Sequence, residues 1–141
     1  MAKRDLTGAV DFEHLERYAG GDAALVEEVL GIFREQAEIW LRLLDPAAPG
    51  EAWRDAAHSL KGSALGVGAF ALAERCAAAE QVDKGGEGER AVLLNHIRTA
   101  LDAALADVAA YLHERALQSL KSPMSSSSRP QRPPGSEEPG P

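Results

Sequence analysis

The chain has 141 residues, which is enough for one domain of ordinary size, and 45% of them are hydrophobic. The net charge of −7 argues against non-specific binding to nucleic acid, which needs Lys and Arg to neutralise phosphates. No apolar run has the length of a signal peptide or a membrane span, and the single cysteine, Cys76, cannot form an internal disulfide, so a reducing, cytoplasmic location is expected.

The first half of the chain has the spacing of helices and lacks the period of two that marks a strand. Abundant Ala and Leu also favour helix. A short helix is predicted over 11–18, before Gly20 and Gly21. Asp22 is expected to cap a second helix that reaches about residue 44. Its predicted inward stripe is Leu25, Val29, Phe33, Ala37, Trp40 and Leu44.

Three further helices are predicted after the segment DPAAPG at 45–50, whose prolines disfavour continuation of the second helix. They cover about 51–65, 70–83 and 89–117. The inward stripe of the last helix is predicted to be Leu94, Ile97, Leu101, Ala104, Val108 and Leu112. Short connections imply antiparallel neighbours, so the sequence predicts an all-α, up-down four-helix bundle with the short first helix packed at one end.

The predicted domain organisation has three parts. Residues 1–10 form an N-terminal extension and residues 11–120 form the bundle. Residues 121–141 are rich in proline and serine and hold almost no aliphatic side chain. Such a segment cannot bury enough apolar surface to offset its ordering entropy, so a disordered tail is expected.

The third predicted helix carries His58 on its outer side. At about 100° per residue, His58 lies roughly 145° from the middle of the apolar face. That face consists of Trp53, Ala56, Ala57, Leu60 and Ala64. His58 is therefore predicted to be exposed rather than to fill the core. An ordinary surface histidine remains the alternative at this point.

Three neighbours of His58 favour a functional role. Lys61, three residues on, places a cation beside the ring, and Gly62, four residues on, clears the next turn. Leu65 leaves an aliphatic group exposed close by. A nucleophile, a positive charge, a cleared surface and an apolar contact together predict a docking site for a group that carries a phosphoryl moiety.

The stretch HSLKGSALGVGA, residues 58–69, resembles the signature of histidine-containing phosphotransfer (HPt) domains of two-component phosphorelays. Helix order and length extend the resemblance over about residues 11–117. It implies that His58 accepts a phosphoryl group from one receiver-domain aspartate and passes it to another, while Lys61 steadies the phosphate.

The same resemblance implies where a receiver docks. Many members place a glutamine near the histidine on the next helix, where an ungapped count puts Glu80, with Gln81 one residue later. Both stay open as candidates. The expected docking residues are Arg54, Asp55, Ser59, Gly62, Ser63, Leu65, Glu80 and Gln81.

The expected chemistry needs no cofactor of the chain's own. Imidazole titrates near neutrality, so a neutral fraction with a free lone pair exists at cellular pH. No aspartate cluster suited to Mg²⁺ is apparent, so the metal is expected from the receiver. The segment GSALGVG matches neither common phosphate-binding glycine motif, so autophosphorylation from ATP is not expected. A metal site of Glu51, Asp55 and His58 is conceivable but weak, because it holds a single histidine.

Two other functions remain as alternatives. One is a non-catalytic adaptor or dimeric bundle that binds through an apolar helix face, and the other is a detached phosphotransfer module of a chemotaxis-type kinase. The relay protein itself is expected to be a monomer that works with the receiver domains of a hybrid histidine kinase and a response regulator, without nucleic acid or membrane. His14, His96 and His113 are predicted to be surface residues, and Cys76 to be buried with Leu72 and Ala73.

Overall fold

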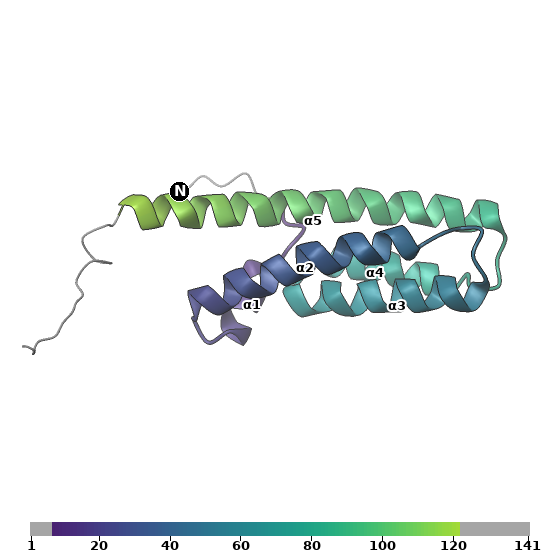
Figure 1. The fold of residues 1–141 in the computed structure, drawn as a ribbon, viewed down its shortest axis with the longest axis horizontal. Helices are drawn as coiled ribbons and strands as arrows, with labels where there is room; N and C mark the ends of the chain where they lie inside the picture. The colour runs from purple at the N-terminus through teal and green to yellow at the C-terminus, as the bar shows by residue number, and fades with distance from the viewer. Residues whose placement is uncertain (1–6, 122–141) are drawn as a thin grey trace, which may run out of the picture.

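The computed structural model describes residues 7–121, and this part of the chain contains five helices and no strand (Figure 1). The helices are α1 (Phe12–Tyr18), α2 (Ala23–Leu43), α3 (Gly50–Val67), α4 (Phe70–Glu80) and α5 (Glu87–Lys121). The all-α prediction is thereby confirmed. The predicted tail, apart from its first residue, and residues 1–6 of the predicted extension lie outside the described residues.

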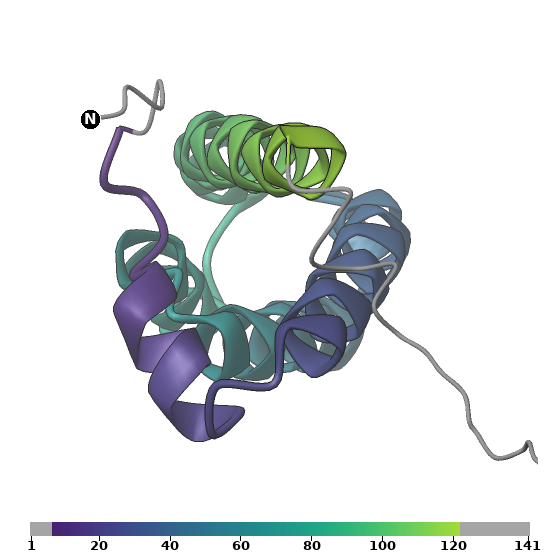
Figure 2. The ribbon, with the colours of Figure 1, turned by 90° about the vertical axis from the view of Figure 1, so that its left-hand side faces the viewer.

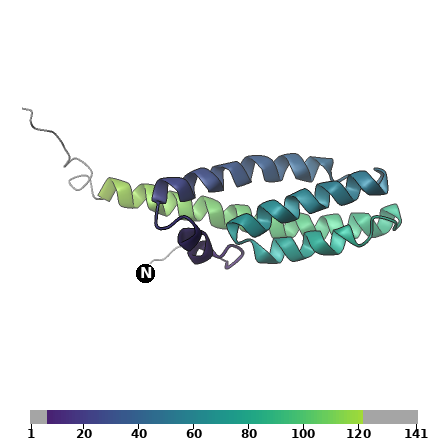
Figure 3. The same cartoon turned by 90° about the horizontal axis from the view of Figure 1, so that it is seen from below.

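Helices α2 to α5 form the bundle, and consecutive helices run antiparallel (Figures 1 and 3). The end-on view in Figure 2 shows the four helices around a common centre, with α1 at one end. Helix α3 packs between α2 and α4, and α5 closes the ring against α4 and α2. This arrangement leaves the outer side of α3 free to present side chains to solvent.

The helix ends have visible causes in the sequence. Asp11 and Asp22 cap α1 and α2, because their carboxylates accept the backbone N–H groups of His14 (3.1 Å) and Leu25 (3.2 Å). Gly68 ends α3 with φ of +87°, a conformation that favours glycine. A Cβ at Gly68 would also lie 2.7 Å from the carbonyl oxygen of Asp11, so both backbone geometry and close packing require glycine there.

Three helices differ in length from their predictions, and the first of them, α3, covers 50–67 rather than about 51–65. Helix α4 ends at Glu80, three residues early, because the chain then forms turns in which Val82 N–H bonds to Ala79 and Gly85 N–H bonds to Val82. Helix α5 covers 87–121 rather than about 89–117, and its last turns extend past the end of the bundle (Figure 1).

The core confirms the predicted inward face of α3, since all five residues of that face are buried. In α5 the predicted stripe is buried except for Leu112, which is partly buried. The predicted α2 stripe is wrong at Leu25, which is exposed, and only partly right at Val29 and Trp40. The residues of α2 that enter the core are Val26, Leu30, Phe33 and Ala37.

The prediction for α2 is right at Phe33, Ala37 and Leu44 but misses Val26 and Leu30, because this helix carries two adjacent apolar stripes. The inner stripe starts at Val26 and packs in the core. The second stripe runs beside it through Leu25, Val29 and Ile32, of which Leu25 and Ile32 are exposed and Val29 is partly buried against the core. Both stripes have helical spacing, so the sequence pattern cannot say which one is buried. Val29 and Ile32 of the second stripe line a groove on the surface of the protein.

Buried polar groups, which the sequence pattern did not single out, fix the N-terminal segment and α1 to α5. Asp107 is fully buried and accepts the backbone N–H groups of Thr7 (2.8 Å) and Ala9 (2.9 Å). The Tyr111 hydroxyl donates to Glu16 (2.6 Å), and its ring stacks on Phe12 with centroids 4.3 Å apart. Burial, followed by the hydrogen bond to Glu16, raises the pKa of Tyr111 to about 12.

The single cysteine of the sequence lies in the core. Cys76 is fully buried, with Leu72 and Ala73 also in the core, as predicted. Burial, with a smaller contribution from the charge of Glu80, raises the pKa of its thiol to about 12. Among the described residues, no helix combines the length and the apolar character needed to cross a bilayer.

Candidate functional site

His58 stands on the outer side of α3, and its side chain is 72% exposed. The preceding Ala57 and the following Leu60 are fully buried and hold this part of α3 against the core. The ring therefore points outward because its helix is anchored on the opposite face. This orientation agrees with the angular argument from the sequence.

Glu80, the last residue of α4, brings His58 and Lys61 together. Its Oε2 lies 2.8 Å from His58 Nδ1, and its Oε1 accepts a hydrogen bond from Lys61 Nζ at 3.0 Å. The Glu80 side chain is only 12% exposed, so the carboxylate lies between the two helices. Of the two residues left open on the next helix, Glu80 reaches the histidine. Gln81 caps the end of α4, and its side chain is exposed.

The protonation of Glu80 fixes the chemistry of the ring. Burial alone would raise the pKa of Glu80, but the hydrogen bonds and charges of Lys61 and His58 outweigh it and lower that pKa below its ordinary value. The carboxylate is thus ionised at neutral pH and can only accept hydrogen bonds. His58 Nδ1 must therefore donate, which leaves the lone pair of the neutral ring on Nε2.

Replacement of Glu80 by glutamine tests this charge arrangement. A carboxyl group with a lowered native pKa stabilises the fold above its unfolded-state pKa, and this contribution is lost as pH falls through the lowered value. We expect the free energy of unfolding of the wild type to exceed that of Glu80→Gln by about 1 kcal/mol at neutral pH. The margin should begin to shrink as the pH falls below the ordinary value of 4.5 and be lost once the pH has passed the lowered native value. Denaturant titrations between about pH 3 and pH 7 measure this margin, and a margin that grows on acidification would contradict the assignment.

The surface one turn after His58 is bare. Gly62 is exposed, and a Cβ added there would meet no atom of the neighbouring structure within 4 Å. Leu65, the next residue on this side, is 45% exposed. The protein itself therefore gives no packing reason for glycine at position 62.

Two apolar grooves flank this bare part of α3. The larger, about 580 Å³, lies between α1, α2 and α3, and its lining includes Tyr18, Ile32 and Leu65. The smaller, about 270 Å³, lies between α3 and α4 and is lined by Lys61, Leu65 and Phe70 among others. We call the larger one the α1–α3 groove. Leu65 contributes to both grooves, so the surface beside His58 has an apolar hollow on each side.

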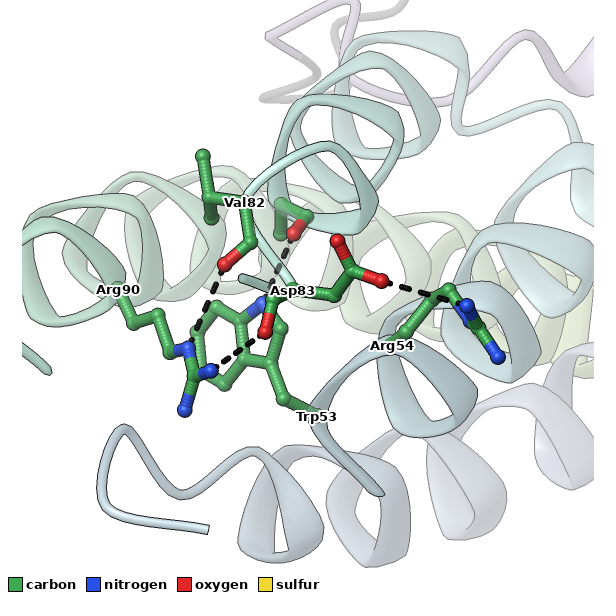
Figure 4. Close-up of polar contacts among 6 residues, drawn as sticks. Trp53, Arg54, Val82, Asp83 and Arg90 are labelled. Carbon is green, nitrogen blue, oxygen red and sulfur yellow. Dashed lines mark hydrogen bonds and ion pairs between the residues drawn. The ribbon is translucent and has the colours of Figure 1, made fainter. Parts of the chain in front are cut away.

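The other predicted docking residues lie along the same outer half of α3. Asp55 is exposed, whereas Ser59 and Ser63 are partly buried. Arg54 is engaged within the protein, because its Nη1 lies 3.2 Å from Asp83 Oδ2 (Figure 4). The sequence did not anticipate this ion pair.

The other three histidines differ in exposure, and none of them joins a metal-ligating cluster among the described residues. His96 and His113 are exposed, as predicted, whereas His14 is partly buried, with its ring edge-on to Phe70 at 5.3 Å. Across residues 7–121, no three His, Cys, Asp or Glu side chains gather closely enough to hold a metal ion.

A comparison with known protein families finds one that matches most of the helical bundle. The model of the Hpt domain matches residues 25–113, which span α2 to α5 and include His58, Lys61 and Glu80. The chain belongs to the Hpt family. As an Hpt protein it is a phosphotransfer intermediate of a two-component phosphorelay and works with receiver domains.

A solved structure supports the same assignment. The chain is similar to the histidine phosphotransferase ShpA from Caulobacter crescentus, with 54% sequence identity and a TM-score of 0.67. The match covers 80% of this chain and 99% of that one. No curated protein matched the chain.

Proposed function

We propose that His58 is the phosphoacceptor of this Hpt protein and that Nε2 is the reacting atom. The Nε2 lone pair attacks the phosphorus of an aspartyl phosphate on a receiver domain. A P–N bond forms, the P–O bond to the aspartate breaks, and the aspartate leaves as a carboxylate. The observation that carries this proposal is an exposed ring whose Nδ1 lies 2.8 Å from Oε2 of the Glu80 carboxylate.

Glu80 and Lys61 contribute charge to this transfer. As Nε2 bonds to phosphorus, the ring becomes cationic and keeps its Nδ1 proton, which the Glu80 carboxylate accepts in a hydrogen bond. Lys61 Nζ, 3.0 Å from Glu80 and partly exposed, lies on the same surface and provides a compact positive charge for the phosphoryl oxygens. Transfer to a second receiver aspartate reverses the bond changes.

The receiver supplies what this chain lacks for the reaction. It brings the aspartate, and it also brings Mg²⁺, since the carboxylate that contacts His58, that of Glu80, is already used by both His58 and Lys61. The protein takes its phosphoryl group from a receiver and has no autokinase activity with ATP. It acts as a cytoplasmic monomer, independent of nucleic acid and membrane.

The receiver docks over Gly62, with apolar side chains in the α1–α3 groove. Ile32 lines this groove and is 47% exposed, so an aspartate there would place a charge in the interface without disturbing the core. The loss of apolar burial and the desolvation of the carboxylate predict about tenfold to 100-fold weaker receiver binding for Ile32→Asp. Isothermal titration against the receiver measures the affinity.

The matched control for this substitution is Val92→Asp. Val92 is 54% exposed on α5, and it is absent from the residues that line either groove. Receiver affinity should stay at the wild-type value in this variant. Equal weakening by both substitutions would show that the α1–α3 groove has no special part in docking.

The direct test of the proposed function is phosphoryl uptake. The full chain is incubated with a receiver domain phosphorylated by a labelled small-molecule donor, with Mg²⁺ present. We expect label that is stable in alkali and labile in acid, and fragment mass spectra that locate it on the peptide containing His58. Label on another residue, or no label with any cognate receiver, would contradict the proposal.

A further inference from the structure

Glu80 lies at the weakest part of its helix. Helix α4 has only 11 residues, and the three before Glu80 are alanines with little side chain to pack. The last carbonyl groups of a helix lack intrahelical partners, and helix ends fray. The residue after Glu80 is Gln81 in the right-handed conformation, so no glycine motif locks this end. The close contact with His58 needs another source of order.

One anchor comes from the indole of Trp53. Trp53 is fully buried, and its Nε1–H donates to the carbonyl oxygen of Ala79 at 2.8 Å (Figure 4). Ala79 immediately precedes Glu80, and Trp53 lies on the same helix as His58. This buried hydrogen bond therefore ties the last turn of α4 to the helix that carries the phosphoacceptor.

The second anchor is the guanidinium of Arg90, a residue that is only 7% exposed. It donates to four carbonyl oxygens: Asp83 at 2.6 Å, Ala48 at 2.7 Å, Pro46 at 3.1 Å and Val82 at 3.4 Å. Figure 4 shows its bonds to the chain directly after α4, beside the Trp53 ring. Its charge lies 5.8 Å from the centre of that ring and complements the negative end of α4.

The neighbouring residues fit the same contact. Arg54 pairs with the Asp83 carboxylate at 3.2 Å from the solvent side. Gly50, the first residue of α3, lies so close that an added Cβ would collide with the Asp83 carbonyl oxygen and would also lie 3.3 Å from Arg90 Nη2. The loop after α4 thus depends on the missing side chain at position 50 as well as on the donors of Trp53 and Arg90.

We infer that Trp53 and Arg90 are positioning residues for phosphoryl acceptance, because they hold the last turn of α4 where Glu80 reaches His58 Nδ1. The inference rests on the proposed role of His58. A shift of α4 by one residue along its axis, about 1.5 Å, exceeds the slack of a 2.8 Å hydrogen bond. Once Glu80 moves away, Nδ1 loses its acceptor and the proton can occupy Nε2, where it blocks attack on phosphorus.

The experiment reads the tautomer of His58 by nitrogen NMR on the full chain, at a pH where the ring is neutral. Glu80→Ala sets the spectrum of a ring without its acceptor. Trp53→Phe removes the indole donor, and Arg90→Met removes the guanidinium but keeps an unbranched apolar side chain. In both variants we expect the Nδ1–H tautomer to lose population, so that the nitrogen spectrum of His58 shifts towards that of Glu80→Ala. Tyr111→Phe, which removes a hydrogen bond between α5 and α1, should keep the wild-type tautomer.

The outcomes separate positioning from general stability. Folded Trp53→Phe and Arg90→Met proteins with the wild-type tautomer would overturn the inference, as would an equal shift in Tyr111→Phe. Circular dichroism shows whether the two variants fold. If either does not, two milder variants take its place: Arg90→Lys, which keeps a buried cation, and Gly50→Ala, which removes no donor. The tautomer of His58 in these variants then decides in the same way.

A second readout connects the tautomer to the reaction. Phosphoryl uptake should slow in step with the loss of the Nδ1–H form, by up to about 100-fold for a displacement near 1 Å. The NMR result needs no receiver. Failure of wild-type His58 to take up label would therefore refute the proposed function and leave the tautomer result readable, whereas an unchanged tautomer refutes the positioning role alone.

Discussion

The His58→Gln variant is expected to take up no label from a phosphorylated receiver while it folds like the wild type. Glutamine has no nucleophilic nitrogen to replace Nε2, so the loss should be complete. The side chain is 72% exposed and its one described polar contact within the protein is with Glu80, so the free energy of unfolding should change by no more than about 1 kcal/mol. A gel assay of label transfer and a denaturant titration measure the two quantities.

The matched control is His96→Gln on α5. His96 is also exposed, and its helix neighbours Arg98 and Thr99 share its solvent-facing environment. This variant should take up label at the wild-type rate. Label that persisted in His58→Gln and vanished in His96→Gln would place the acceptor on α5 and refute the site.

The Gly62→Leu variant is expected to combine unchanged or higher stability with slower transfer. A leucine at this helical position gains about 1 kcal/mol in helix propensity. The structure offers no atom within 4 Å of the new Cβ to offset that gain. In the complex, however, the leucine would stand between His58 and the receiver. Displacement of the reacting atoms by about 1 Å predicts a transfer rate up to about 100-fold lower.

Gly31→Leu provides the comparison for Gly62→Leu. Gly31 also lies inside a helix with nothing within 4 Å of an added Cβ, but on α2 and outside both grooves beside His58. It should gain similar stability and keep the wild-type transfer rate. Wild-type transfer by Gly62→Leu would refute the idea that this glycine leaves room for a receiver. The rates of phosphoryl transfer are measured by stopped-flow fluorescence quenching or by label transfer under single-turnover conditions.

The fold was predictable where one face of a helix was unambiguous. Helix α3 has one dense apolar face built on Trp53 and Leu60, so its rotation, and with it the exposure of His58, followed from spacing alone. Helix α2 has two apolar stripes, and the choice between Leu25 and Val26 as its inner edge depends on which neighbours pack against it. That choice is made by tertiary packing, which the periodicity of a single helix does not contain.

Local spacing predicted the part of the site on α3, and the family resemblance added Glu80 only as one of two candidates on the next helix. His58, Lys61 and Gly62 lie within two turns of one helix, whereas the contact with Glu80 needs the relative position of two helices. The four carbonyl partners of Arg90 come from two separate loops, and a carbonyl group leaves no mark in the sequence. Asp107 left a weak signal, since it is a charged residue three positions after the buried Ala104 and next to the buried Val108.

The sealed thiol of Cys76 makes this protein convenient to label. The thiol is fully buried and its pKa is raised to about 12, so it stays protonated and inaccessible to maleimide reagents in the native state. A cysteine introduced at an exposed position would then be the one reactive thiol of the folded chain, because the sequence contains no other. A fluorophore attached there could report receiver encounters in real time with the wild-type core intact.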